Sequence, residues 1–186
     1  MKSCRQLVPL IDFNGYIEMR KIIIICLCIV GLGLYLPVNA QRVAAVVERD
    51  SLSKPYHPEA DAQADIDNLI QKAGVQGKNI IMQAGGNWCI WCLRFNNYIQ
   101  GDPDVATLLE DNFLYYHLNF SKENKNEEVF KKYAPEGSKL GYPFFIVMNQ
   151  KGEVLEVHDS GSLEDGKGYA KQKVLSFFGK HIPKGE

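Results

Sequence analysis

The stretch Trp88-Cys89-Ile90-Trp91-Cys92 follows an apolar run and opens a helical pattern, and it holds two cysteines separated by two residues. Unpaired backbone N–H groups at a helix N-terminus carry partial positive charge, which stabilises a thiolate. Because Cys89 lies nearer that end than Cys92, we expect Cys89 to ionise more easily and to attack other disulfides. Cys92, one helical turn further in, can then resolve the mixed disulfide. A reversible dithiol/disulfide couple is therefore the leading hypothesis.

The N-terminal segment has the pattern of an export signal. Residues 22–36 form an apolar core between the basic pair Arg20-Lys21 and a short stretch that ends at Ala40. This arrangement predicts a signal peptide over 19–40 and a protein that is periplasmic or extracellular. Met19 directly precedes the basic pair, so we expect translation to start there and residues 1–18 to be an upstream extension. The alternative is a retained membrane anchor, for which the apolar run is short against the roughly 20 residues of a spanning helix.

The rest of the chain, 41–186, is long enough for one domain and too short for two. We expect a lead-in over 41–57 and one domain over 58–186. The formal net charge of the whole chain is −1, which gives no indication of nucleic-acid binding. Exported proteins enter an oxidising compartment, and beyond residue 40 the sequence keeps only the close pair of cysteines. This context favours a redox role for the pair.

The spacing of apolar residues predicts a mixed sheet covered by helices on both faces, an α/β fold. Strands are expected where short apolar or alternating runs are bounded by turn residues, and helices where apolar residues recur at helical spacing behind capping residues. The expected strands are 79–84, 113–120, 143–148 and 153–158, with a possible short edge strand at 43–47; the expected helices are 58–73, 89–99, one that starts at Asp102-Pro103, 127–133 and 163–179.

These residues resemble the thioredoxin superfamily, and within it the exported thioredoxin-like proteins with a Trp-Cys-x-Trp-Cys motif. The likeness covers roughly residues 58–180. It rests on the apolar strand before the motif, on the motif itself, and on the strand Gly141-Tyr142-Pro143-Phe144-Phe145-Ile146-Val147-Met148 with a hairpin after it, all in the order that the family has. The resemblance implies a thioredoxin-like fold.

The resemblance also implies a thiol-disulfide oxidoreductase, either a reductase or an isomerase, with a part in cell redox homeostasis. Its partners would be disulfide-containing exported proteins and a redox partner that recycles the dithiol, with no cofactor and no metal. Pro143 would be cis and lie against the dithiol, and the backbone of Tyr142 would pair with an extended substrate segment. We place Trp88 and Trp91 at the substrate-binding surface: Trp88 is expected to pack beside the motif, and Trp91, between the cysteines, to be partly exposed and to offer apolar contact to a substrate.

One position departs from the family pattern. Typical thioredoxins carry a buried aspartate six residues before the first cysteine of the motif, and here that residue is Gln83. An amide cannot act as a base for the proton of Cys92, so we expect slow resolution of the mixed disulfide. Glu110 and Asp111 are the two acids that we name as alternatives to the missing aspartate, and their spacing favours neither. The charged segment 121–126 is either part of a partner surface or a solvated loop.

Three other readings of the cysteine pair remain open. One alternative is a structural disulfide, but a disulfide that closes a four-residue loop would stabilise the fold by only about 2 kcal/mol in the loop-entropy model. A metal site would need further ligands, for which the candidates are His57, His117, His158 and His181. The chain could also be a binding or assembly module on a thioredoxin-like scaffold, without redox turnover, because fold does not fix function.

Overall fold

The computed structural model describes residues 43–44 and 46–184. The expected signal peptide and the expected start at Met19 lie outside the described residues. Residues 43–44 and 46–47 are helical, so the expected edge strand at 43–47 is wrong. The paired alanines of this segment have the highest helix propensity of any residue, which outweighs the strand preference of the valines around them. The chain divides after Val47, and the fold and site below belong to the unit that starts at Glu48.

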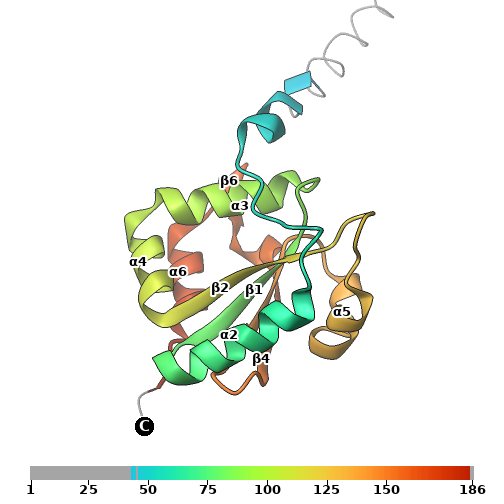
Figure 1. The fold of residues 1–186 in the computed structure, drawn as a ribbon. Coiled ribbons are helices and arrows are strands. Elements are labelled where there is room, and N and C mark those ends of the chain that lie inside the picture. The colour runs from blue at the N-terminus through green and yellow to red at the C-terminus, as the bar shows by residue number, and fades with distance from the viewer. Residues whose placement is uncertain (1–42, 45, 185–186) are drawn as a thin grey trace, which may run out of the picture. The chain divides into compact units, whose positions relative to one another are not determined.

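The domain is built from helices and strands that follow one another closely along the chain (Figure 1). In order the elements are α2 (Ala62–Gln76), β1 (Asn79–Gly85), α3 (Ile90–Gly101), α4 (Pro103–Asn112), β2 (Phe113–Asn119), α5 (Glu127–Tyr133), η1 (Gly137–Lys139), β3 (Phe144–Met148), β4 (Val154–Asp159), η2 (Ser160–Leu163), β5 (Glu164–Asp165), β6 (Gly168–Tyr169) and α6 (Lys171–Gly179). No helix in the described part of the chain is both long and apolar enough to span a membrane.

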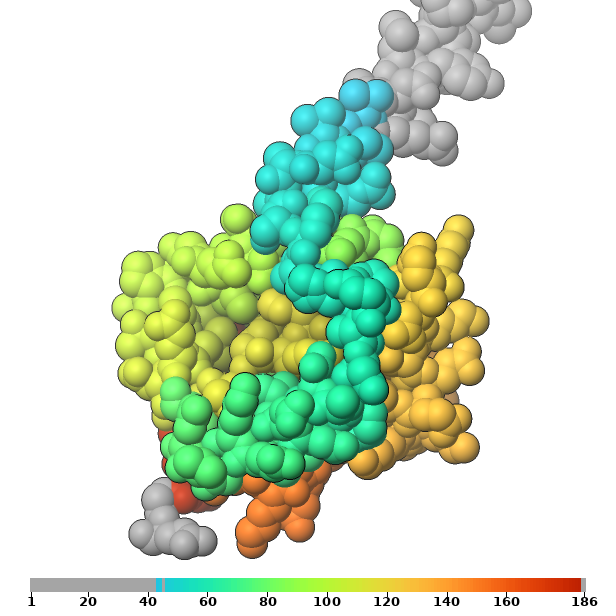
Figure 2. All heavy atoms as spheres, viewed as in Figure 1, coloured from blue at the N-terminus to red at the C-terminus, as the bar shows by residue number. Residues whose placement is uncertain are grey.

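The four longer strands form one mixed sheet in the order β2-β1-β3-β4. β1 pairs parallel with β2 and antiparallel with β3, and β3 pairs antiparallel with β4. Every residue of β1 is buried, which fits its run of apolar residues and its place inside the sheet. The expected central mixed sheet is confirmed. β2 is an edge strand, and Figure 2 shows the hollow beside it, a groove of about 650 Å³ that α3 and α4 also line.

Helices cover both faces of the sheet (Figure 1). Side chains alternate between the faces along a strand, so Ile80 and Met82 of β1 point to one side and Ile81 to the other. The first side packs against α2 and α5, and the second against α3, α4 and α6. By the same alternation Gln83 points to the side of α3. The alternation therefore places the amide side chain of Gln83 on the side of the helix that carries the cysteines.

Helix starts follow the capping residues of the sequence. Asp61 caps α2, accepting a hydrogen bond from the backbone of Ala64, and Asp102 caps α4, with Pro103 as the first helical residue. α2 runs through Gly74 to Gln76. Its C-cap is Gly77, whose φ of 67° is a conformation that glycine adopts without strain.

The expected helix 163–179 is wrong in its first half. Only Lys171–Gly179 is helical, and the residues before it form η2 and the small hairpin of β5 and β6. Gly166, with a φ of 57°, makes the turn of that hairpin. Tyr169 fits the helical spacing of the residues after it, but it belongs to β6, where its buried ring packs against Phe95 of α3.

Candidate active site

The two cysteines lie at the junction of β1 and α3 and form a disulfide, with their Cα atoms 5.3 Å apart. Cys89 is the N-cap of α3, and the backbone N–H of Cys92 donates a hydrogen bond of 3.1 Å to the Cys89 sulfur. Cys92 is completely buried, whereas Cys89 keeps 6% of its surface exposed. After reduction this N–H group and the helix terminus would stabilise a thiolate on Cys89. The geometry is the one expected from the sequence.

Tyr142, which precedes β3, lies against the disulfide. The Tyr142–Pro143 peptide bond is cis, as the resemblance implies. The carbonyl oxygen of Tyr142 lies 3.5 Å from the Cys89 sulfur. Pro143 is buried and Tyr142 partly exposed. The structure thus brings Tyr142 to Cys89 and Cys92, which lie about 50 positions earlier in the sequence.

Trp88 joins an aromatic group beside the dithiol. Its side chain is 50% exposed, and its indole N–H donates a hydrogen bond of 2.6 Å to the carbonyl oxygen of Phe120. Its ring meets that of Tyr142 edge-on at 5.5 Å, and Tyr142 stacks on Phe120 at 5.3 Å. A cavity of about 370 Å³, lined by Trp88, Phe120 and the charged residues that follow, opens here. The charged segment 121–126 therefore borders the dithiol region through its residues Ser121, Lys122, Glu123 and Lys125.

Trp91 is held by a different set of contacts. The guanidinium of Arg94 lies over the Trp91 ring at 4.8 Å, and the Tyr169 hydroxyl donates a hydrogen bond of 3.1 Å to the Trp91 carbonyl oxygen. Arg94 in turn makes two hydrogen bonds of 2.7 Å with Glu48. The hydrogen bonds from Arg94 hold the pKa of Glu48 below its ordinary value, so this carboxylate is charged at neutral pH. Trp91 is partly buried, which leaves it less surface for a substrate than Trp88 has.

Gln83 lies buried beneath Cys92, and every polar atom of its amide takes part in a hydrogen bond. Its nitrogen donates to the Tyr56 hydroxyl oxygen at 2.7 Å and to the Cys92 carbonyl oxygen at 3.0 Å. Its oxygen accepts a hydrogen bond of 2.6 Å from the Tyr115 hydroxyl. Sequence reasoning identified Gln83 as unusual but missed the two tyrosines, because residues 27 and 32 positions away in the chain carry no local signal of contact.

Glu110 and Asp111 are not placed to substitute for the missing aspartate. Both are exposed in the last turn of α4, whereas Cys92 and Gln83 are completely buried. The Glu110 carbonyl accepts a hydrogen bond from Lys78. The polar side chains placed near Cys92 are the amide of Gln83 and the phenol of Tyr56.

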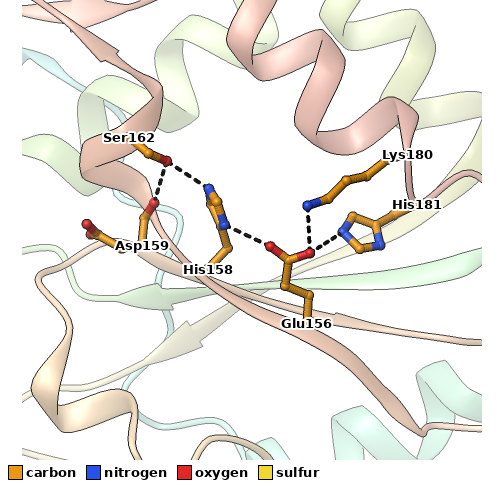
Figure 3. Close-up of polar contacts among 6 residues, drawn as sticks. All are labelled: Glu156, His158, Asp159, Ser162, Lys180 and His181. Atoms are coloured by element: carbon orange, nitrogen blue, oxygen red, sulfur yellow. Dashed lines mark hydrogen bonds and ion pairs between the residues drawn. The ribbon is translucent and has the colours of Figure 1, made fainter.

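The four histidines lie in different places. His57 is exposed, and His117 packs edge-on against Tyr56 with a ring distance of 5.1 Å. His158 and His181 both contact Glu156 of β4 (Figure 3). Across the described residues, no three histidine, cysteine or carboxylate side chains are grouped so that they could hold a metal ion.

Comparisons with known proteins point to thiol-disulfide chemistry. No protein-family model matches the chain. The sequence is 28% identical over 104 residues to the thiol:disulfide interchange protein DsbD of Salmonella typhimurium, a match that covers 55% of this chain and 18% of that protein. It is 27% identical over 93 residues to DsbD of Colwellia psychrerythraea, covering 50% of this chain and 15% of that protein. The chain thus spans less than a fifth of the length of these relatives.

Among solved structures, the disulphide isomerase of Xylella fastidiosa Temecula1 superposes with a TM-score of 0.61 and 22% sequence identity. The match covers 70% of this chain and 98% of that one. At this level of identity the superposition supports the fold. The chain therefore has a thioredoxin-like fold with a Cys-x-x-Cys disulfide at its strand-to-helix junction, and it is homologous to a part of the DsbD thiol:disulfide interchange proteins.

Proposed function

We propose that this protein is a thiol-disulfide oxidoreductase that exchanges disulfides with other proteins through Cys89 and Cys92. The observation that carries the proposal is the disulfide at the N-terminus of α3, with its more exposed sulfur on the helix cap and beside the Tyr142 carbonyl. Homology to proteins named for thiol:disulfide interchange supports it. The short loop that this disulfide closes argues against a purely structural role.

In the reducing direction the reaction has two steps. The Cys89 thiolate attacks one sulfur of a substrate disulfide, so that a bond forms between the two proteins and the second substrate sulfur leaves as a thiolate, which takes a proton from water. Cys92 then loses its proton to water and attacks the Cys89 sulfur, which releases the first substrate sulfur as a thiol. Two electrons pass from the protein dithiol to the substrate. The same steps in reverse oxidise a substrate dithiol.

We propose that substrates approach over Trp88, Tyr142 and Pro143, with Trp91 at the side. The Tyr142 carbonyl beside the Cys89 sulfur suits an extended chain whose cysteine reaches that sulfur, since backbone groups pair with extended segments without regard to sequence. The half-exposed indole of Trp88 and the cavity next to it offer apolar contact for the residues that flank the substrate cysteine.

We also propose that the protein works outside the cytoplasm, on exported proteins, as a reductase or an isomerase. The signal-like segment over 19–40 supports this placement, together with a sequence that keeps only the close pair of cysteines after residue 40. A separate redox partner would recycle the dithiol. Contact with a membrane is expected only if the apolar segment is retained.

A trapped mixed disulfide tests the proposal directly. Cys92→Ser leaves Cys89 without its resolving thiol, so this variant should accumulate covalent complexes with exported proteins that disappear on reduction. Cys89→Ser is the matched control and should accumulate none. If neither variant traps a protein while the wild-type chain binds a partner without redox exchange, the chain is a binding or assembly module instead.

A further inference from the structure

Tyr56 enters the active site from outside the segment that carries the cysteines. It precedes α2, yet it is 2% exposed and packs in one buried cluster with Cys89 and Cys92. Asn87, two residues before Cys89, binds its backbone on both sides: the Tyr56 N–H donates to the Asn87 side-chain oxygen at 3.2 Å, and the Asn87 amide nitrogen donates to the Tyr56 carbonyl at 2.8 Å. These two bonds fix Tyr56 relative to the loop that presents the dithiol.

The hydroxyl of Tyr56 and the Cys92 sulfur both face Gly85 and lie no more than about 5.3 Å apart. Both atoms are closer than 3.0 Å to the point where a Cβ atom on Gly85 would stand, so only glycine leaves room for them there. The amide nitrogen of Gln83 can only donate, so its bond of 2.7 Å occupies a lone pair of the phenolic oxygen. That bond leaves the phenolic proton available. In the disulfide form no hydrogen bond joins this hydroxyl to the Cys92 sulfur, so the bond proposed below is one that forms to the free sulfur of Cys92.

We propose that Tyr56 is a positioning residue for Cys92, whose phenolic O–H donates a hydrogen bond to the Cys92 sulfur and stabilises its thiolate while the mixed disulfide is resolved. This inference rests on the proposed oxidoreductase function. Gln83 holds the phenolic oxygen in place, and Tyr115 holds Gln83. An amide and two phenols thus take the place of the buried acid of typical thioredoxins.

The protons and electrons of the step balance without a base in the protein. The Cys92 proton goes to water, the Cys92 sulfur forms a bond with the Cys89 sulfur, and the bond between Cys89 and the substrate breaks. Tyr56 keeps its own proton throughout. Burial raises the pKa of Tyr56 well above its ordinary value, so the phenol remains a donor across the neutral range.

Three phenols and one imidazole that pack around the pair keep a constant charge around neutral pH. Burial raises the pKa of the phenols of Tyr115, Tyr142 and Tyr169. Burial also lowers the pKa of His117, whose ring packs against Tyr56, to about 4. A change in the pH profile of resolution therefore reports on the cysteines and on the hydrogen bond that Cys92 receives.

A single-turnover reaction with the aryl disulfide dithiobis(nitrobenzoate) separates the two steps, because each step releases one coloured thiolate. With reduced protein and one equivalent of probe, the first release reports attack by Cys89 and the second reports resolution by Cys92. Tyr56→Phe keeps the ring and removes the hydroxyl. We expect it to slow the second release about tenfold at neutral pH, the scale of one hydrogen bond to a charged group, and to move its pH profile to higher pH. The first release should be unchanged.

Tyr98→Phe is the matched control, because the Tyr98 hydroxyl is buried without a hydrogen-bond partner among the described residues. It should leave both releases unchanged. Should Tyr56→Phe fold poorly, Tyr115→Phe, which loosens Gln83, should slow the second release by a smaller factor. A second release with unaltered rate and pH profile in folded Tyr56→Phe would overturn the inference. Absence of both releases in the wild-type protein would instead overturn the oxidoreductase function.

Discussion

The sulfur of Cys89 receives the 3.1 Å hydrogen bond from the Cys92 backbone, and residue Cys89 keeps 6% of its surface exposed, while Cys92 is completely buried. We therefore expect iodoacetamide to label Cys89 of the reduced protein first, at least tenfold faster than Cys92 near neutral pH, and with a lower pH midpoint. Mass spectrometry of the labelled peptide measures the site. Cys89→Ser is the control and should react slowly. Faster labelling of Cys92 would reverse the roles assigned to the two cysteines.

At the scale of single residues, the sequence predicts those features that depend on residues close together in the chain. The cysteines lie at the predicted helix start, because a helix cap depends on a few neighbouring residues, and the cis bond before Pro143 is the one that the family resemblance implies. Tyr56 could not be identified in this way. Tyr56 is held in the site by hydrogen bonds to Asn87 and Gln83, and these residues come together only when the chain has folded.

Among the elements, α3 is held to the sheet mainly by Phe95. This residue is completely buried and packs against rings from three other elements, Phe145, Tyr169 and Phe178. Phe95→Ala should lower the free energy of unfolding by about 3–5 kcal/mol, the usual cost of such a cavity. Urea denaturation measures the change.

The exposed Asn97 on the same helix provides the control. Asn97→Ala should change the free energy of unfolding by less than about 0.5 kcal/mol. If Phe95→Ala behaved like Asn97→Ala, the packing of α3 on β3, β6 and α6 would not be what stabilises the helix that carries the dithiol.

The pattern of apolar residues predicted the central elements well and the peripheral ones poorly. α5 occurs at the expected residues, and β1 and α4 begin where the sequence indicates, because buried runs and capping residues specify them. The segment before α6 was misread since Tyr169 continues the helical spacing of Val174 and Phe177. The turn at Gly166 breaks that pattern, and burial of the Tyr169 ring against α3 accounts for the spacing equally well.

Across the whole molecule, two partly buried histidines make stability depend on pH. Burial lowers the pKa of His117 to about 4 and also lowers the pKa of His181, which lies at the end of α6 and shares Glu156 with His158 and Lys180 (Figure 3). In the unfolded chain histidine titrates near 6.5, so there the unfolded state binds more protons than the folded state. The stability that these histidines contribute is fully present above pH 6.5 and is lost as the pH falls towards 4.

Urea denaturation midpoints, measured at several pH values between 7 and 4, test this dependence. His117→Phe keeps a ring against Tyr56 and removes the titrating group, so it should reduce the loss of stability on acidification. His57→Gln changes an exposed histidine and should keep the wild-type loss. An equal loss in wild-type and His117→Phe would show that His117 does not contribute to it.

The redox potential also depends on contacts that link distant parts of the chain. A cation beside a dithiol stabilises the thiolate, which favours the reduced form and makes the disulfide a stronger oxidant. Arg94, on the ring of Trp91, is the cation in contact with the motif, and its two hydrogen bonds to Glu48 offset its charge. We therefore expect a potential nearer to about −270 mV, the value of a reductant, than to about −120 mV, the value of a strong oxidant.

Removal of the carboxylate charge tests this argument. Glu48→Gln leaves Arg94 with its full positive charge beside the motif, so the potential measured against a glutathione buffer should become less negative and the pKa of Cys89 should fall. Arg94→Gln together with Glu48→Gln removes both charges and should return the potential towards that of the wild type, because the net charge beside the motif is then restored. If Glu48→Gln leaves the potential unchanged, the pair only fixes Trp91 in place, and the reducing character must come from the hydrogen bonds around the two sulfurs.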